Sequence, residues 1–169
     1  AQHLIRKKIT TADMLVAYGN SAGGLVVGRV INTHPELFRA AILDHAYLDV
    51  VNTMMHDTVP LTTDEYLEWG NPQQPEVFRY QLGYSPYQNL RPQAYPNVLL
   101  TCGLRDYRTP AWMAAKHTAQ LRALNTSNSE ILLLSDLQGG HIGNTTDKEW
   151  IKQFARLYGF VEQCLFAEE

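Results

Sequence analysis

The sequence predicts an α/β protein with a mostly parallel sheet flanked by helices, and three observations carry this prediction. Short apolar runs alternate with longer segments of helical composition towards both ends of the chain. A strand, a helix and a second strand follow one another over residues 13–43, which is the βαβ unit of a parallel sheet. The alternation returns over residues 97–134. With 169 residues, the chain is long enough for one domain with a buried core.

The first half of the chain has one well-defined series of elements. Helical composition covers residues 2–8. The apolar run at 13–18 predicts a strand, because a strand buried on both faces of a parallel sheet is continuously apolar. Residues 21–33 predict a helix that Pro35 ends, and the apolar run at 38–43 predicts the second strand.

Between residues 44 and 96 the hydrophobic periodicity fades. Prolines interrupt it at positions 60, 72, 75, 86, 92 and 96. We expect one helical turn over residues 64–68 and another over 75–82, where Pro75 suits the first helical position. So long a segment with little regular structure is typical of a functional or ordered excursion.

Regular elements return in the second half. Residues 97–102 predict a strand, 110–124 a helix, and 129–134 a further strand. Apolar residues at helical spacing over 145–165 predict a closing amphipathic helix.

Composition excludes several classes of function. A net charge of −3 gives no reason to expect nucleic acid or an anionic membrane surface as a partner. Cys102 and Cys164 do not make a disulfide framework, and no Cys/His cluster has zinc-ligand spacing. We therefore expect no metal and no other cofactor. We find no run apolar enough to span a membrane and no signal peptide.

The stretch Gly19-Asn20-Ser21-Ala22-Gly23 fits the G-x-S-x-G nucleophile elbow, in which a serine occupies a sharp turn between a strand and a helix. The predicted strand before it and helix after it are what this geometry requires. We expect glycine two residues either side of Ser21 because side chains there would clash in so tight a turn.

Two further residues complete a candidate catalytic triad. A serine hydroxyl needs a base to take its proton, and the base works best when a carboxylate fixes its tautomer. Asp106 follows the strand at 97–102, and His141 lies in a Gly-Gly-His loop after the next strand. The order serine, acid, histidine, each at the carboxyl edge of the sheet, is that of α/β-hydrolases. The sequence therefore predicts Ser21 as nucleophile, His141 as general base and Asp106 as the orienting acid.

Other assignments are weaker. Asp44 and Asp49 also follow a strand, but the Gly-Leu-Arg-Asp turn suits the acid better. The remaining candidate bases lie at helix ends, in loops or on helix surfaces, where a structural or solvated role is expected: His34, His45, His56 and His117. The acidic residues Asp64, Glu65 and Glu68 form either a solvated helix face or an acidic binding pocket.

Several stretches, irregular loops included, resemble the catalytic domain of the prolyl oligopeptidase family. They are Gly19 to Leu25, Pro60 to Thr63, Glu68 to Pro72, Tyr84 to Tyr87, Cys102 to Asp106, and Gly140-His141. Within that family, the chain is most similar to the oligopeptidase B and prolyl endopeptidase-like branches. The resemblance covers nearly the whole chain.

The resemblance implies a cytoplasmic serine peptidase in which an α/β-hydrolase domain lies beneath a β-propeller that admits only short peptides. Residues 1–169 would be the C-terminal part of the hydrolase domain, with the early strands and the propeller outside this chain. The N–H of Ala22 would be one oxyanion donor, and the second, a tyrosine, would precede Ala1. Arg108 would hold a carbonyl of the substrate backbone.

The resemblance also implies a substrate pocket, in which this sequence departs from the family pattern. Oligopeptidase B prefers arginine or lysine before the cleaved bond and places two glutamates in that pocket. Here the first falls on Glu65 and the second on Leu67, while Tyr47 lines the same pocket. Asn20 is a variant at the elbow. We therefore expect a weaker preference for basic residues, and a shift towards other residues or towards esters stays open.

The main interpretation is a serine peptidase segment that cleaves short peptides. The alternatives are a small-ester hydrolase and a catalytically inert fragment or interaction module of the same fold. We expect residues 1–169 to depend on the missing N-terminal part of a longer protein, or to form a homodimer, because the strand at 13–18 would otherwise present an unpaired edge.

Overall fold

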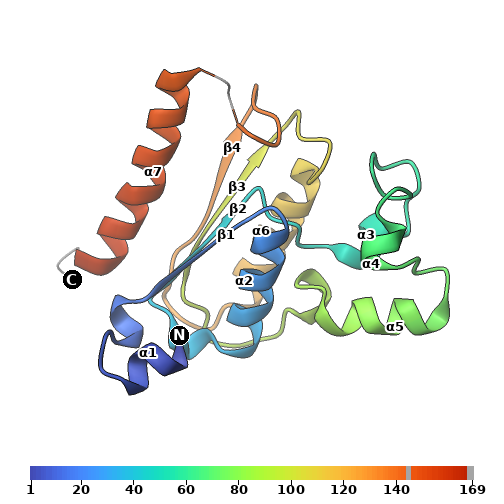
Figure 1. Ribbon diagram of the computed structural model, residues 1–169. Helices are drawn as coiled ribbons and strands as arrows, with labels where there is room; N and C mark the ends of the chain where they lie inside the picture. Colours follow the sequence, from blue (N-terminus) through green and yellow to red (C-terminus); the bar gives the residue numbers. More distant parts are fainter. Residues whose placement is uncertain (144–145, 167–169) are drawn as a thin grey trace.

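In the computed structural model, which describes residues 1–143 and 146–166, four strands form a parallel sheet (Figure 1). Their order in the sheet, β1-β2-β3-β4, is their order along the chain. All three pairs of neighbours are parallel. The strands are β1 (Val16–Asn20), β2 (Ala40–Asp44), β3 (Asn97–Gly103) and β4 (Ile131–Asp136). The predicted α/β class with a parallel sheet is confirmed.

Helices join these strands. The longer ones are α2 (Ala22–Thr33), α5 (Pro75–Tyr84), α6 (Ala111–Leu124) and α7 (Asp147–Phe166). The shorter α-helices are α1 (Gln2–Arg6), α3 (Val50–Met54) and α4 (Tyr66–Trp69). Single 3₁₀ turns occur at η1 (Ala12–Met14), η2 (Pro35–Leu37) and η3 (Tyr87–Asn89).

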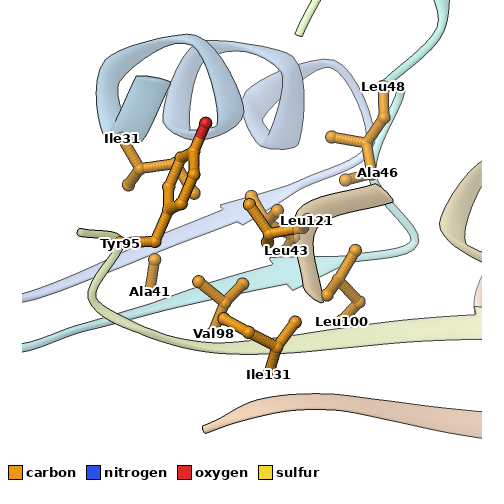
Figure 2. Packing of buried hydrophobic residues seen from close by; sticks show 10 residues of the cluster. All are labelled: Ile31, Ala41, Leu43, Ala46, Leu48, Tyr95, Val98, Leu100, Leu121 and Ile131. Carbon is orange, nitrogen blue, oxygen red and sulfur yellow. The ribbon is translucent and has the colours of Figure 1, made fainter. Parts of the chain in front are cut away.

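The two faces of the sheet bury different side chains, because successive residues of a strand point to opposite faces. Leu43 and Leu100 belong to the core that also contains Ile31 of α2 and Leu121 of α6 (Figure 2). Leu99, next to Leu100 in sequence, belongs instead to a core with Leu157 and Phe160 of α7, together with Ala40 and Ile42. Helices therefore cover both faces, with α2 and α6 on one side and α7 on the other (Figure 1).

The segment between β2 and β3 is an ordered excursion with its own small core. The helical turns predicted at 64–68 and 75–82 are present as α4 and α5. No sequence pattern predicted α3, which has only five residues and is capped by the Asp49 side chain accepting from Asn52 N. Side chains from α2, α3, α6 and the loop after β2 form the core of the excursion, with Tyr66, Trp69 and Tyr84 packed against it: Leu25, Tyr47, Val50, Met54 and Met113.

Three predicted strands begin and end too early, and one of them, predicted at 38–43, spans Ala40–Asp44. The first spans Val16–Asn20 instead of 13–18, because Asp13 lies in the η1 turn and Asn20 still pairs with Asp44 in the ladder. The strand predicted at 129–134 spans Ile131–Asp136 for a similar reason, since polar Asp136 pairs with Gly103. The start predicted for the closing helix, residue 145, lies outside the described residues, and α7 spans Asp147–Phe166.

Both cysteines, Cys102 and Cys164, are free and buried. Within residues 1–143 and 146–166, no helix combines the length and the apolar character needed to cross a membrane.

Candidate active site

Ser21 occupies a sharp turn between the end of β1 and the start of α2. Its backbone has φ 54° and ψ −123°, a conformation that residues other than glycine rarely adopt. Three backbone hydrogen bonds hold it there: Ser21 N donates to Asp44 O at 3.0 Å, and Ser21 O accepts from Gly24 N at 2.9 Å and from Tyr47 N at 3.0 Å. The strain and its support are those of a nucleophile elbow.

The glycines around the elbow are not all required by close packing. A Cβ on Gly19 would lie 2.4 Å from Gly23 O, and a Cβ on Gly24 would lie 2.3 Å from Ala46 Cβ. A Cβ on Gly23 would meet nothing within 4 Å, so the clash expected there is wrong. What the close turn excludes is a side chain at Gly19, which faces the backbone of Gly23.

The three predicted triad residues meet at the carboxyl edge of the sheet. His141 Nε2 lies 3.0 Å from Ser21 Oγ, and His141 Nδ1 lies 2.9 Å from Asp106 Oδ2. They come from the loops after β1, β3 and β4, whose parallel strands end at the same edge. The hydrogen bonds link the hydroxyl, the imidazole and the carboxylate in the order that proton transfer requires.

The surroundings of Asp106 keep it ionised. Its side chain is fully buried, while that of His141 is 12% exposed. Oδ1 accepts from Arg108 N at 2.8 Å and Thr109 N at 2.9 Å, and Oδ2 accepts from Thr109 Oγ1 at 2.7 Å. Burial raises the pKa of Asp106, but the hydrogen bonds from His141 and Thr109 outweigh it and bring the pKa below its ordinary value.

The acid loop and the histidine loop are packed against each other. Leu104 N donates to Asp136 O at 2.9 Å, and Arg105 N donates to Gly139 O at 3.0 Å. A Cβ on Gly103 would lie 2.4 Å from Gly139 O, so only glycine permits this approach. The relative position of Asp106 and His141 is thus fixed by the backbone as well as by their own hydrogen bond.

Ala22, the predicted oxyanion donor, is the first residue of α2. The first N–H groups of a helix have no acceptor within it, and the helix dipole favours negative charge at this end. The N–H of Ala22 is therefore placed beside Ser21 with the polarity that an oxyanion needs.

A hollow of about 140 Å³ lies beside Ser21 and brings the predicted substrate-binding residues together. It is lined by Ser21, Ala22, Tyr47, Glu65, Glu68, Trp69, Arg108 and Thr109. Leu67, where the resemblance places a second acid, is fully exposed. The second carboxylate of the hollow is instead Glu68, which the sequence suggested only as part of the acidic cluster with Asp64 and Glu65; of that cluster, Glu65 and Glu68 line the hollow. Residues three apart share a helix face, so the i, i+3 spacing of Glu65 and Glu68 was the available signal.

Two aromatic side chains in contact with each other form part of the wall of this hollow. The rings of Tyr47 and Trp69 lie 5.4 Å apart, and Trp69 Nε1 donates to Glu65 Oε2 at 3.0 Å. Tyr47 is 7% exposed, and burial raises the pKa of its hydroxyl, which stays neutral. The hollow combines apolar walls with two carboxylates.

Asp44, the alternative acid, is bonded to a different histidine. Its Oδ1 accepts from His45 Nδ1 at 3.0 Å and from Thr101 Oγ1 at 2.5 Å, while Oδ2 accepts from Tyr18 OH at 2.8 Å. Burial raises the pKa of Asp44, but these hydrogen bonds outweigh it and bring the pKa to about 2. Asn20, the elbow variant, also donates to Asp44 Oδ2. Asp44 thus fixes the end of β1, where the elbow begins, through hydrogen bonds from Tyr18 and Asn20.

Two of the four remaining histidines are buried, which fits a structural role and not a solvated one. His45 is 4% exposed, and its ring lies 6.2 Å from that of His141 in an edge-on arrangement. His117 is fully buried on α6, and burial lowers the pKa of its imidazole to about 3, so it is neutral. His34 and His56 are exposed, as expected.

The other acid considered, Asp49, lies away from the triad. It is fully buried and forms an ion pair with Lys116 of α6. Across the described residues, no group of three or more His, Cys, Asp or Glu side chains could hold a metal ion.

Comparisons with known proteins give relatives along nearly the whole chain. Protease 2 of Moraxella lacunata is 38% identical over 168 residues, which cover 99% of this chain and 24% of the relative. Dipeptidyl aminopeptidase BI of Pseudoxanthomonas mexicana is 37% identical over 159 residues, which cover 94% of this chain and 22% of the relative. The chain thus spans about a quarter of the length of these curated relatives.

Solved structures give the same result. Oligopeptidase B from Leishmania major superposes with a TM-score of 0.95 at 41% identity, over 97% of this chain and 23% of that structure. Oligopeptidase B from Trypanosoma brucei with covalently bound antipain superposes with a TM-score of 0.94 at 40% identity, over 99% of this chain and 24% of that structure. These matches identify the fold as part of an α/β-hydrolase domain. A model described as the prolyl oligopeptidase family matches residues 1–168, and the chain therefore belongs to this family.

Proposed function

We propose that this chain carries the catalytic residues of a serine peptidase that cleaves short peptides through Ser21, His141 and Asp106. The observation that carries the proposal is the continuous hydrogen-bonded line from Ser21 Oγ through His141 to Asp106. The names of the relatives, which include a protease, an aminopeptidase and an oligopeptidase, support peptides as the substrate class.

In the proposed mechanism, Ser21 Oγ attacks the carbonyl carbon of the scissile bond while His141 Nε2 takes the hydroxyl proton. Asp106 stabilises the imidazolium and holds the tautomer with the proton on Nδ1. The oxyanion accepts a hydrogen bond from Ala22 N at the start of α2. His141 then gives its proton to the leaving amine, and a water molecule hydrolyses the acyl-enzyme by the same proton transfers in reverse.

The hollow beside Ser21 supports a preference for a basic residue before the cleaved bond. Glu65 and Glu68 supply two negative charges, and the rings of Tyr47 and Trp69 can pack against the methylene groups of a long side chain. A guanidinium can pair with a carboxylate through two parallel hydrogen bonds. Glu65 also accepts from Trp69 Nε1, which leaves it fewer free lone pairs for a ligand. Arg108 lines the same hollow and is the proposed contact for a substrate carbonyl.

The test uses two short peptides that differ only in the residue before the cleaved bond, arginine in one and its neutral isostere citrulline in the other. The longest native polypeptide that contains this chain should cleave the arginine peptide about tenfold faster. Ser21→Ala should reduce kcat on both peptides by about 10⁶-fold, as expected for loss of a triad nucleophile. Ser21→Ala protein that cleaves as fast as the unmodified protein would overturn the assignment. Equal cleavage of the two peptides would overturn only the specificity.

A small-ester hydrolase is the alternative that shares this chemistry, because an ester is attacked by the same nucleophile. Comparing an arginyl ester with an unsubstituted acyl ester in the same assay separates the two, since only a peptidase-type pocket should favour the arginyl group. An inert module of the same fold would cleave neither the esters nor the peptides.

We further propose that residues 1–169 act as part of a longer polypeptide, supported by their coverage of about a quarter of the relatives. β1 is at the edge of the sheet, and apolar side chains near it and on α7 are exposed, including Tyr18, Ile151 and Tyr158. Further strands or a second copy in a homodimer would cover them. A cytoplasmic location rests on the family resemblance alone.

A further inference from the structure

A second hollow, of about 500 Å³, lies on the His141 side of the candidate active site. Its walls come from the acid loop and the histidine loop, and they carry Arg105, Tyr107 and Arg108 as well as His141. No aspartate or glutamate is among its lining residues. Within the described part of the chain, neither arginine forms a salt bridge. The hollow therefore carries the positive charges of Arg105 and Arg108, of which Arg108 also shares the first hollow with Glu65 and Glu68.

The backbone positions of both arginines are fixed by the triad loops. Arg105 N donates to Gly139 O at 3.0 Å, and Arg108 N donates to Asp106 Oδ1 at 2.8 Å. A positively charged group on such an anchored loop loses less freedom on binding than one on a mobile segment. The positive charges are thus held at the same edge of the sheet as the reacting atoms.

The chemistry of the proposed reaction places the leaving part of a peptide beside His141, which lines this hollow and a smaller one that contains Asp44. His141 gives its proton to the leaving amine, so the residues after the cleaved bond lie beside His141. The acyl part stays on Ser21, beside the hollow that Glu65 and Glu68 line. The first hollow therefore presents two carboxylates and Arg108 to the acyl part, whereas the second presents Arg105 and Arg108 and no carboxylate to the leaving part.

We propose that the hollow at Arg105 binds a carboxylate carried by the leaving part of the substrate, within the first three residues after the cleaved bond. This inference rests on the proposed function. The substrate class becomes short peptides that are basic before the bond and anionic after it. The carboxylate is either a free α-carboxylate or an acidic side chain, since both offer the same pair of oxygens to a guanidinium. Arg108 lines both hollows, whereas Arg105 lines only this one, so Arg105 is the residue to test.

Both arginines are exposed, so the effect should be moderate. Pairs of exposed charges reach the equivalent of about fivefold in affinity, and salt screens them. We expect the preference for an anionic leaving part to be about fivefold in kcat/KM at low ionic strength and close to absent at about 0.5 M salt. Electrostatic attraction before the chemical step should act mainly through KM.

The experiment uses three peptides with the same residues up to the cleaved bond and three residues after it. The peptides differ only in the leaving part. In the first peptide this part has uncharged side chains and an amidated end, and in the second it has uncharged side chains and a free α-carboxylate. In the third it has an amidated end and glutamate as the second residue after the bond. They are assayed with the longest native polypeptide that contains this chain and with its Arg105→Gln and Arg79→Gln variants. Arg79 is an exposed arginine of α5 outside the hollow and serves as the matched control.

The unmodified protein and Arg79→Gln should prefer at least one anionic peptide about fivefold, and the preferred peptide identifies the source of the carboxylate. Arg105→Gln should lose that preference while cleaving the neutral peptide at the unmodified rate, which shows that it is folded. Equal cleavage of the three peptides by the unmodified protein, or an undiminished preference in Arg105→Gln, overturns the inference. Absence of Ser21-dependent cleavage of all three overturns the proposed function, and this inference with it.

Discussion

Replacing Asp106 by asparagine should disable the site through the tautomer of His141. Asp106 Oδ2 accepts from His141 Nδ1 at 2.9 Å, which requires the proton on Nδ1 and leaves Nε2 free to take the proton of Ser21. The two backbone donors, Arg108 N and Thr109 N, both bond to Oδ1, so the asparagine oxygen takes that position. Its NH₂ group then faces His141 Nδ1 and makes it an acceptor. The proton moves to Nε2, which can no longer act as the base.

The expected loss is about 10⁴-fold in kcat, the size measured for this change in another serine protease. It corresponds to about 5 kcal/mol of transition-state stabilisation. The fold should be retained, because asparagine has the shape of aspartate and keeps the acceptor for the backbone donors.

The assay measures kcat on the arginine peptide, with Asp44→Asn as the matched control. Asp44 is equally buried and also bonded to a histidine, but its partner is His45. Asp44→Asn should therefore lower kcat far less than Asp106→Asn. A 10⁴-fold loss in Asp44→Asn together with near-normal turnover in Asp106→Asn would show that the acid has been misassigned.

Three further predictions concern stability and binding. The pKa of the Asp44 carboxyl is about 2 in the fold against an ordinary value of 3.8, so its ionised form contributes about 2 kcal/mol of stability above pH 4 that is lost as the pH falls towards 2. In urea unfolding, the free energy of unfolding of Asp44→Asn should therefore fall less between pH 4 and pH 2 than that of the unmodified protein. An equal fall in the two proteins would contradict this. Gly24→Ala should destabilise by about 1–3 kcal/mol because its Cβ would lie 2.3 Å from that of Ala46. Gly159→Ala in α7, where a Cβ meets nothing within 4 Å, should instead stabilise by about 1 kcal/mol, and thermal unfolding checks both signs. Glu65→Gln should raise KM for the arginine peptide and leave that for the citrulline peptide unchanged; a parallel rise for both would indicate a structural role.

The sheet and the arrangement of the triad residues could be predicted because they follow from local patterns and one rule of topology. Apolar runs identified the strands, and parallel strands place their carboxyl ends together, so Ser21, Asp106 and His141 had to meet if each followed a strand. Strand ends were less accurate, since Asn20 and Asp136 are polar residues that still pair in the ladder.

The parts that could not be predicted depend on contacts between segments distant in sequence. The burial of His45 results from Asp44 and Thr101 meeting across neighbouring strands, which no local pattern shows. The burial of His117 was accessible in principle, because Met113 and Leu121 lie four residues either side of it on the buried face of α6.

The substrate hollow lies between these two cases. The resemblance directed attention to position 67, but α4 turns that side chain outward and brings Glu68 to the hollow with Glu65. Helical spacing was the better guide to the second carboxylate at this site.

Covalent labelling of Ser21 tests most directly whether the triad works as a unit. A fluorophosphonate probe reacts with a serine whose proton an assembled base removes. Incubating the longest native polypeptide that contains this chain with the probe, followed by peptide mass spectrometry, should find one adduct, on Ser21. His141→Ala and Asp106→Asn should label much more slowly, and Asp44→Asn at a rate near that of the unmodified protein. Absence of an adduct on Ser21 in the folded, unmodified protein would contradict the proposal that these residues form a working nucleophile.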